Sequence, residues 1–85
     1  MTKLDPAVTE ILQSDRNLSG FNLDGADLTG INLENVTLTS ASLKGANLAE
    51  ASLVGADLTD ANLEGADVSL ADLREAKLNL SLIHI

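Results

Sequence analysis

The sequence has no cysteine and only one aromatic residue, Phe21. The absence of cysteine excludes disulfides, thiol nucleophiles and cysteine ligands to a metal. Basic residues are also scarce, since 5 Lys and Arg stand against 13 Asp and Glu, which gives a formal charge of −8. Nucleic acids and anionic membrane surfaces both attract proteins through lysine and arginine, so direct binding to either is not expected.

Long apolar runs are missing as well. No stretch approaches the ~20 residues that a membrane-spanning helix needs. The N-terminal stretch MTKLDPAVTE has no apolar signal core, so a cytoplasmic location is expected. At 85 residues the chain is expected to form one small domain, near the size at which a single core is only marginally sufficient.

What the sequence does contain is a repeat of five residues built around a large aliphatic residue, which we call the centre of each unit. Ala usually stands two positions before the centre, and Asn, Asp, Ser or Thr stands just before it. All 6 glycines stand two positions after a centre. The centres are Leu18, Leu23, Leu28, Leu33, Leu38, Leu43, Leu48, Leu53, Leu58, Leu63, Val68, Leu73 and Leu78.

The position of the glycines predicts a corner after every centre. If the centre opens a four-residue turn, the glycine is its third residue, where a type II turn needs positive φ. Glycine adopts this conformation freely and asparagine tolerates it, so the glycines and Asn35 fit. The remaining corner residues are predicted to use another turn type. These residues are Ser40, Glu50, Asp60, Leu70, Glu75 and Leu80.

Between corners the chain is expected to be extended. Side chains alternate along an extended segment, so the centre and the Ala two positions before it point to the same side, the interior. Corners every five residues close a square in four units, or 20 residues, and residues at that spacing should then stack. Such series are Gly25, Gly45 and Gly65, which we take as turn residues, and Asp24, Lys44, Glu64 and His84, whose charges alternate until the end.

The pattern A-[DN]-L-x-x, as in Ala26-Asp27-Leu28 and Ala46-Asn47-Leu48, resembles that of the pentapeptide-repeat family. The resemblance covers residues 16–80. It implies an all-β solenoid, a right-handed quadrilateral parallel β-helix, here of about three coils. Large residues replace Ala at the inward position early in the repeat and are expected where the shaft is least confined, near its end. These are Phe21, Ile31 and Val36.

Residues 1–15 do not fit the repeat and are predicted to cap the first coil with a helix over residues 6–13. Asp5 suits the N-cap position and Pro6 the first helical position. The apolar face of this helix consists of Val8, Ile11 and Leu12. We expect this face to cover the open end of the solenoid and to meet Phe21, since uncovered strand edges invite association.

The repeat ends in an apolar stretch, with residues 81–85 forming a tail or a partial last unit. One interpretation is a surface for homodimerisation or for an unknown protein partner, because exposed apolar residues gather at an open end. The alternative is that these residues fold over the last coil, or mark the edge of a truncated chain. The candidate interface residues are Leu70, Leu80, Leu82, Ile83 and Ile85.

The sequence offers no arrangement of nucleophile and base, so no enzyme activity and no catalytic, metal or cofactor site is expected. His84 is the only histidine and is interpreted as a solvated residue. Several aspartates share the position just before a centre, which favours turn residues that bond nearby backbone amides over a metal site. These aspartates are Asp27, Asp57, Asp67 and Asp72.

The function favoured by these observations is a structural or protein-interaction module of unassigned role. Many members of this family come from bacteria. Some members imitate duplex DNA and bind DNA gyrase, so the resemblance implies an acidic DNA-mimic rod as an alternative. One face of the square carries only acids, namely Asp27, Glu50 and Asp67. The rod is short for this alternative, since about three coils at ~4.8 Å span less than half of the ~34 Å of a DNA turn.

Overall fold

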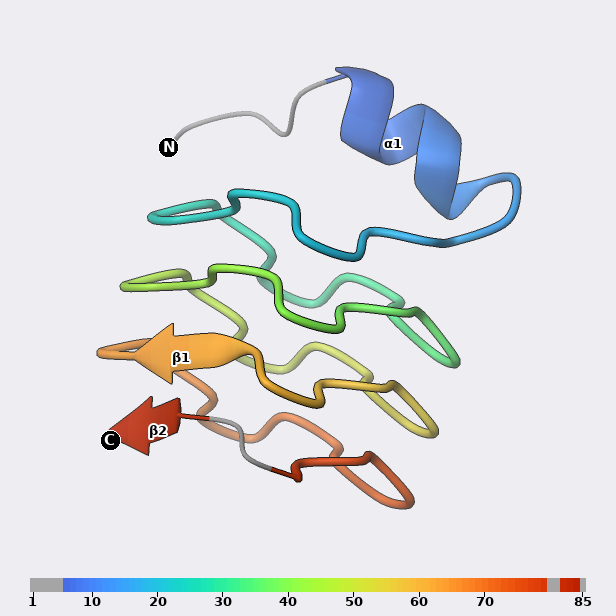
Figure 1. The fold of residues 1–85 in the computed structure, drawn as a ribbon. Helices are drawn as coiled ribbons and strands as arrows, with labels where there is room; N and C mark the ends of the chain where they lie inside the picture. The colour runs from blue at the N-terminus through green and yellow to red at the C-terminus, as the bar shows by residue number, and fades with distance from the viewer. Residues whose placement is uncertain (1–5, 80–81, 85) are drawn as a thin grey trace.

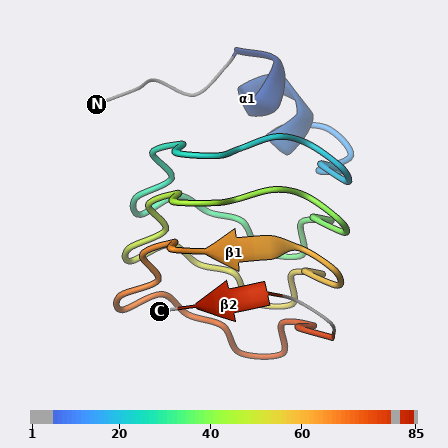
Figure 2. The same ribbon diagram turned by 60° about the vertical axis from the view of Figure 1, so that its left-hand side comes forward.

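The computed structural model describes residues 6–79 and 82–84. These described residues form one helix, α1 (Pro6–Leu12), and two short strands, β1 (Asn62–Glu64) and β2 (Leu82–His84). Elsewhere the described chain alternates between tight turns and single bridged residues. The chain winds as stacked coils with α1 over the first coil, and β2 lies beside β1 (Figures 1 and 2).

Every parallel bridge in the stack joins residues that are 20 positions apart, as Asn17 joins Thr37. The strands continue this spacing, since Asn62 pairs with Leu82. The bridges form separate ladders that run down the sides of the stack, so each coil has 20 residues and four sides. Side A contains Asn17, Thr37, Asp57 and Lys77; side B contains Asn22, Ser42, Asn62 and Leu82; side C contains Asp27, Asn47 and Asp67; side D contains Asn32, Ser52 and Asp72.

Backbone hydrogen bonds connect each coil to the next in a fixed pattern. On side A, the amide of Leu18 donates to the carbonyl of Thr37 at 2.7 Å, and the amide of Gly20 donates to the carbonyl of Thr39 at 2.9 Å. In the opposite direction, the amide of Thr37 donates to the carbonyl of Arg16 at 3.0 Å. Because buried backbone groups need such partners, each coil is stabilised by the coil beside it.

The corners close through a hydrogen bond from the residue three positions after each centre, as from the Phe21 amide to the Leu18 carbonyl at 3.1 Å. Gly20, the third residue of this turn, has φ of 71°, as a type II turn requires. Corners without glycine or asparagine use the same geometry. The Ala41 amide donates to the Leu38 carbonyl at 3.0 Å, and Ser40 between them has φ of 60°.

The prediction that these other corners use another turn type is therefore wrong for every one that the structure describes. Positive φ costs a non-glycine residue of order 1 kcal/mol, but the surrounding backbone fixes the corner. The Ser40 amide, for example, also donates to the Thr59 carbonyl of the next coil at 2.9 Å. Leu80 lies outside the described residues. The corrected corners are Ser40, Glu50, Asp60, Leu70 and Glu75, with φ values of 60°, 62°, 62°, 59° and 61°.

The interior is filled by the centres and by the small residues two positions before them. Each centre from Leu18 to Leu63 is buried, and Leu43, Leu48, Leu53 and Leu58 have no exposed surface. Within residues 8–79 no polar or charged residue is buried. The apolar surface removed from water is therefore the main stabilising contribution, at roughly 1.5–3 kcal/mol for each fully buried leucine.

The large residues at inward positions lie toward the end that α1 covers. Phe21 and Ile31 are partly buried against the core, whereas Val36 is fully buried. From α1, Val8 and Leu12 are buried in the same cluster, and Ile11 packs against it. Toward the other end burial decreases, since Val68 and Leu73 are only partly buried and Leu78 is 37% exposed.

Candidate functional site

The outer wall of the solenoid carries most of the polar side chains, and many of them bond to the wall itself. An Asn or Asp just before a centre accepts a hydrogen bond from the amide two positions later, as Asn17 Oδ1 does from the Ser19 amide at 3.0 Å. The backbone bonds between coils do not use this amide, so the side chain supplies its acceptor. The other acceptors of this kind are Asn22, Asp27, Asn32, Asn47, Asp57, Asn62, Asp67 and Asp72.

The interpretation of the four aspartates as turn residues is confirmed by these contacts. In three of them a neighbouring hydroxyl adds a second bond, as when Thr29 Oγ1 donates to Asp27 Oδ1 at 2.7 Å. The side-chain and backbone hydrogen bonds from Thr29 lower the pKa of Asp27, and those from Ser69 lower the pKa of Asp67 in the same way. These carboxylates therefore remain ionised at neutral pH and are unsuited to general acid catalysis.

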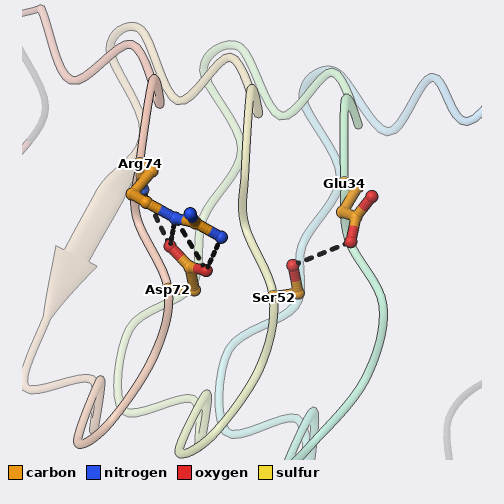
Figure 3. Close-up of polar contacts among 4 residues, drawn as sticks. All are labelled: Glu34, Ser52, Asp72 and Arg74. Carbon is orange, nitrogen blue, oxygen red and sulfur yellow. Dashed lines mark hydrogen bonds and ion pairs between the residues drawn. The ribbon is translucent and has the colours of Figure 1, made fainter.

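On side D, two polar contacts of different kinds lie one coil apart (Figure 3). Arg74 directs its guanidinium at Asp72, with Nε 3.0 Å from Oδ1 and Nη2 2.8 Å from Oδ2. These hydrogen bonds lower the pKa of Asp72 and raise the pKa of Arg74. Ser52 Oγ donates to Glu34 Oε2 at 3.2 Å and so joins two consecutive coils.

A shallow open groove on side D is lined by Val54, Arg74 and Glu75. The cation at this groove already forms a forked pair with Asp72, and Glu75 adds a further negative charge. An anionic ligand would have to compete with both carboxylates for the guanidinium. Among its described lining residues, the groove therefore offers no free donor that would hold a phosphate or carboxylate.

Side B carries the series of alternating charge. The backbone amide of Lys44 donates to Asp24 Oδ1 at 3.0 Å, and the Ser42 hydroxyl also donates to this carboxylate. Lys44 Nζ lies 4.0 Å from Glu64 Oε1, with both side chains about half exposed. An exposed pair of this kind contributes little stability, so the series helps to align coils rather than to form a reactive site.

Among the described residues, side C carries acids and no base. Asp27 and Asp67 belong to one ladder with Asn47 between them, and Glu50 stands at a corner of the same side with φ of 62°. Within the part of the chain that the structure describes, no three His, Asp or Glu residues come together as metal ligands would. The described chain also has no helix that is both long and apolar enough to pass through a bilayer.

The candidate interface residues are placed as follows. Leu70, at a corner of side C, is 85% exposed, and Leu78 beyond it is also exposed. Leu82 and Ile83 belong to β2 and pair with Asn62 and Leu63. Leu80 and Ile85 lie outside the described residues.

The sequence-based candidates for the core and turns also have clear positions. Leu18 to Leu63 are interior and Phe21 lies at the edge of the core, whereas Val68 and Leu73 are only partly buried and Leu78 is exposed. The turn glycines have positive φ, at 68° for Gly25, 66° for Gly45 and 72° for Gly65.

Sequence reasoning missed the role of Arg16, which stands at the inward position of its unit, where Ala is usual. The side chain of Arg16 donates hydrogen bonds to the carbonyls of Leu12, Asn32 and Glu34. A charged residue at an inward position was the available signal, because such a residue cannot enter an apolar shaft and must bond at its rim.

Comparison with known proteins agrees with this architecture. A family model described as pentapeptide repeats, in 8 copies, matches residues 17–53 and 41–79. No curated protein matches the chain. Among solved structures, the pentapeptide repeat protein Rfr23 from the cyanobacterium Cyanothece 51142 is 37% identical with a TM-score of 0.66. The match covers 80% of this chain and 44% of Rfr23, so this chain spans less than half of that relative.

Two further structures come from Nostoc PCC 7120. The pentapeptide repeat protein alr5209 is 24% identical over 92% of this chain and 84% of its own, with a TM-score of 0.35. HetL, a pentapeptide repeat protein involved in heterocyst differentiation regulation, is 31% identical over 76% of this chain and 48% of its own, with a TM-score of 0.23. From the family match and the similarity to Rfr23, we conclude that this chain belongs to the pentapeptide-repeat family.

Proposed function

We propose that the chain is a non-catalytic protein-interaction module whose rigid wall presents side C to a basic partner surface. The observation that carries the proposal is the division of roles along the repeat. Apolar residues fill the interior, and the wall aspartates bond to their own turns, so no described group is arranged for catalysis. Asp27, Glu50 and Asp67 then present fixed negative charge in the absence of any base on that side.

We propose further that residues 16–80 form a β-helix of about three coils and that residues 1–15 form its N-terminal cap. The ladders on each side support the first part, and the burial of Val8 and Leu12 against the core supports the second.

The test of side C is a comparison of the protein with a variant that carries Asp27→Asn, Glu50→Gln and Asp67→Asn. Asparagine forms the same turn bond elsewhere in this wall, so the fold is expected to persist. A binding protein identified by quantitative affinity capture would be purified and titrated against both forms. Its affinity should fall at least about tenfold in the variant and should weaken with salt. Equal affinities for the two forms would exclude side C as the binding surface.

A second candidate is an acidic rod that competes with DNA for an enzyme such as gyrase. The placement of Asp27 and Asp67 in one ladder, with Glu50 on the same side, favours it because negative charge then follows one side of the rod. A gyrase supercoiling assay tests it directly. Lack of inhibition at protein concentrations on the order of tens of micromolar would remove this candidate.

We also propose that the apolar residues near the C-terminal end of the described chain support homodimerisation. Leu70 is 85% exposed, and the partly exposed side chain of Leu78 adds to the apolar surface. Light scattering coupled to size exclusion should show a concentration-dependent dimer that Leu70→Asp weakens. A monomer at every concentration, unchanged by the substitution, would contradict this part of the proposal.

A further inference from the structure

On side D, the backbone carbonyls of the first coil lack the donors that a preceding coil gives to the carbonyls of later coils. In a covered coil, the Ser52 carbonyl accepts the Leu33 amide at 2.7 Å, and the Val54 carbonyl accepts the Asn35 amide at 2.9 Å. Both donors belong to the coil above. The corresponding carbonyls of the first coil need donors as well, but the residues above them follow α1 and do not form a coil.

The corresponding carbonyls of the first coil, those of Asn32 and Glu34, are both bonded by a single side chain. Arg16 Nη2 donates to the Asn32 carbonyl at 2.8 Å, and Arg16 Nε donates to the Glu34 carbonyl at 3.1 Å. These distances are close to those of the backbone bonds one coil below. The planar guanidinium offers two parallel N–H groups on one edge, which suits two carbonyls that point the same way from alternate residues of an extended segment.

The third contact of the same group reaches the helix. Arg16 Nη1 donates to the carbonyl of Leu12, the last residue of α1, at 2.8 Å. Carbonyls at a helix end have no partner within the helix and favour a cation. The guanidinium therefore joins the end of α1 to the rim of the first coil.

The backbone of Arg16 is held from both sides. Its amide donates to the Ile11 carbonyl at 2.9 Å, and its carbonyl accepts the Thr37 amide at 3.0 Å. Its φ is 58°, although it is not a corner residue of the repeat. A non-glycine residue adopts this conformation when the surrounding contacts determine it.

From this geometry we infer that Arg16 is a latch: its guanidinium replaces two amides of a missing coil and holds α1 closed over the first coil. It makes α1 a lid held in place by one side chain as well as by the packing of Val8 and Leu12. It also explains why the inward position next to the rim carries a long cation where the other units mostly carry alanine.

The unmodified protein provides a first test, because Arg16 and Arg74 are its only arginines. Nitrogen-15 NMR should show a Nε–H signal for Arg16 that exchanges slowly and couples through the hydrogen bond to the Glu34 carbonyl carbon. Arg74, whose side chain is 78% exposed, serves as the internal control and should exchange faster. Equal, fast exchange of the two signals would overturn the latch.

The second test separates geometry from charge. Arg16→Ala and Arg16→Lys should each lower Tm by about 5–10 °C, because lysine keeps the charge but cannot form the fork. Lys44→Ala, which removes one exposed positive charge elsewhere, is the matched control and should change Tm by less than about 2 °C. Wild-type stability in Arg16→Lys would show that charge alone suffices and would contradict the inference.

The lid has its own readout in amide hydrogen exchange. In both Arg16 variants, the amides of Ser14 and residue 16, which bond to the Ile11 carbonyl, should exchange at least about tenfold faster. The amide of Leu48 in the middle of the stack reports unfolding of the whole domain and should change only in proportion to overall stability. If the protection at residues 14 and 16 falls no more than that of Leu48, Arg16 does not hold a separate lid.

Discussion

The coil around Leu48 and the units around Val68, Leu73 and Leu78 have nearly the same repeat but different surroundings. Leu48 has no exposed surface, while Leu78 is 37% exposed and Val68 and Leu73 are only partly buried. The difference does not come from the residues themselves, because both regions place a large aliphatic residue at the centre. We infer that a centre is buried mainly by side chains of the neighbouring coils, whereas each unit forms its own turn.

The largest expected difference between the two regions concerns the centres. Leu48→Lys should unfold the domain at 25 °C, since it buries a charge among apolar side chains and small domains have only about 5–15 kcal/mol of stability. Leu78→Lys should cost less than about 1.5 kcal/mol, because the longer side chain can reach solvent. Circular dichroism and urea unfolding measure both. A folded Leu48→Lys protein would show that the inward assignment is wrong.

The cost of replacing a corner glycine should not depend on how deeply the centres of that region are buried. Gly45 has φ of 66° and Gly65 has φ of 72°, and an added Cβ would meet no atom within 3.4 Å at either position. We expect Gly45→Val and Gly65→Val each to cost about 2 kcal/mol, because a β-branched residue is strained at positive φ. The matched control Gly45→Asn should cost less than about 1 kcal/mol, as Asn35 holds φ of 58° in this wall. Equal costs for valine and asparagine at position 45 would contradict this explanation.

The contribution of the turn aspartates to stability should depend on pH. The pKa of Asp27 and of Asp67 is lowered chiefly by hydrogen bonds from Thr29 and Ser69, so each binds protons less readily in the folded chain than in the unfolded one. Their stabilisation is therefore complete above the unfolded pKa of about 3.9 and is lost as the pH falls through the lower folded value.

Asp67→Asn keeps an acceptor for the turn and should remove part of this pH dependence while changing stability little at pH 7. Asp67→Ala should destabilise at pH 7, because the Ser69 amide and hydroxyl lose their acceptor. Urea unfolding at pH 7 and at about pH 3 distinguishes them. The same pair of substitutions at Asp27 should behave alike, and a much larger effect at one site would indicate a contribution from outside the turn.

The smallest expected effect is at the exposed ion pair of side B. Lys44→Ala should change stability by less than about 0.5 kcal/mol, because Lys44 Nζ is 4.0 Å from Glu64 Oε1 and both groups are half exposed. Its amide bond to Asp24 does not depend on the side chain. A loss above about 1 kcal/mol, measured by urea unfolding, would mean that charge stacking contributes more than the present geometry implies.

The sequence predicted the repeat, the 20-residue spacing of stacked residues and the turn role of aspartates such as Asp27, since each follows from local periodicity. It predicted the wrong geometry for corners such as Ser40 and Glu50. Intrinsic preference opposes positive φ there, and bonds from adjacent coils outweigh that preference. The contacts of Arg16 were also beyond it, because they join three carbonyls whose proximity arises only after the first coil has closed.

The sequence predicted some of the side-chain contacts between coils on sides B and D, but not all of them. The spacing of 20 residues indicated that Lys44 would lie between Asp24 and Glu64. The hydrogen bond from Ser52 to Glu34 joins residues that are 18 positions apart, so the 20-residue spacing of stacked residues does not predict it. The role of side C in binding depends on a partner surface, and no pattern within one chain specifies that surface.

The strict 20-residue register also limits how a protein of this kind can change its length. Removing or adding five residues between Lys44 and Glu64 would shift every later unit to the neighbouring side, so that Glu64 would no longer stand below Lys44. Removing or adding 20 residues would return each later unit to its own side and leave every column intact. Insertions and deletions that keep the stacked side-chain contacts are therefore expected in multiples of 20 residues. In evolution, such a protein should gain or lose whole coils rather than single pentapeptides.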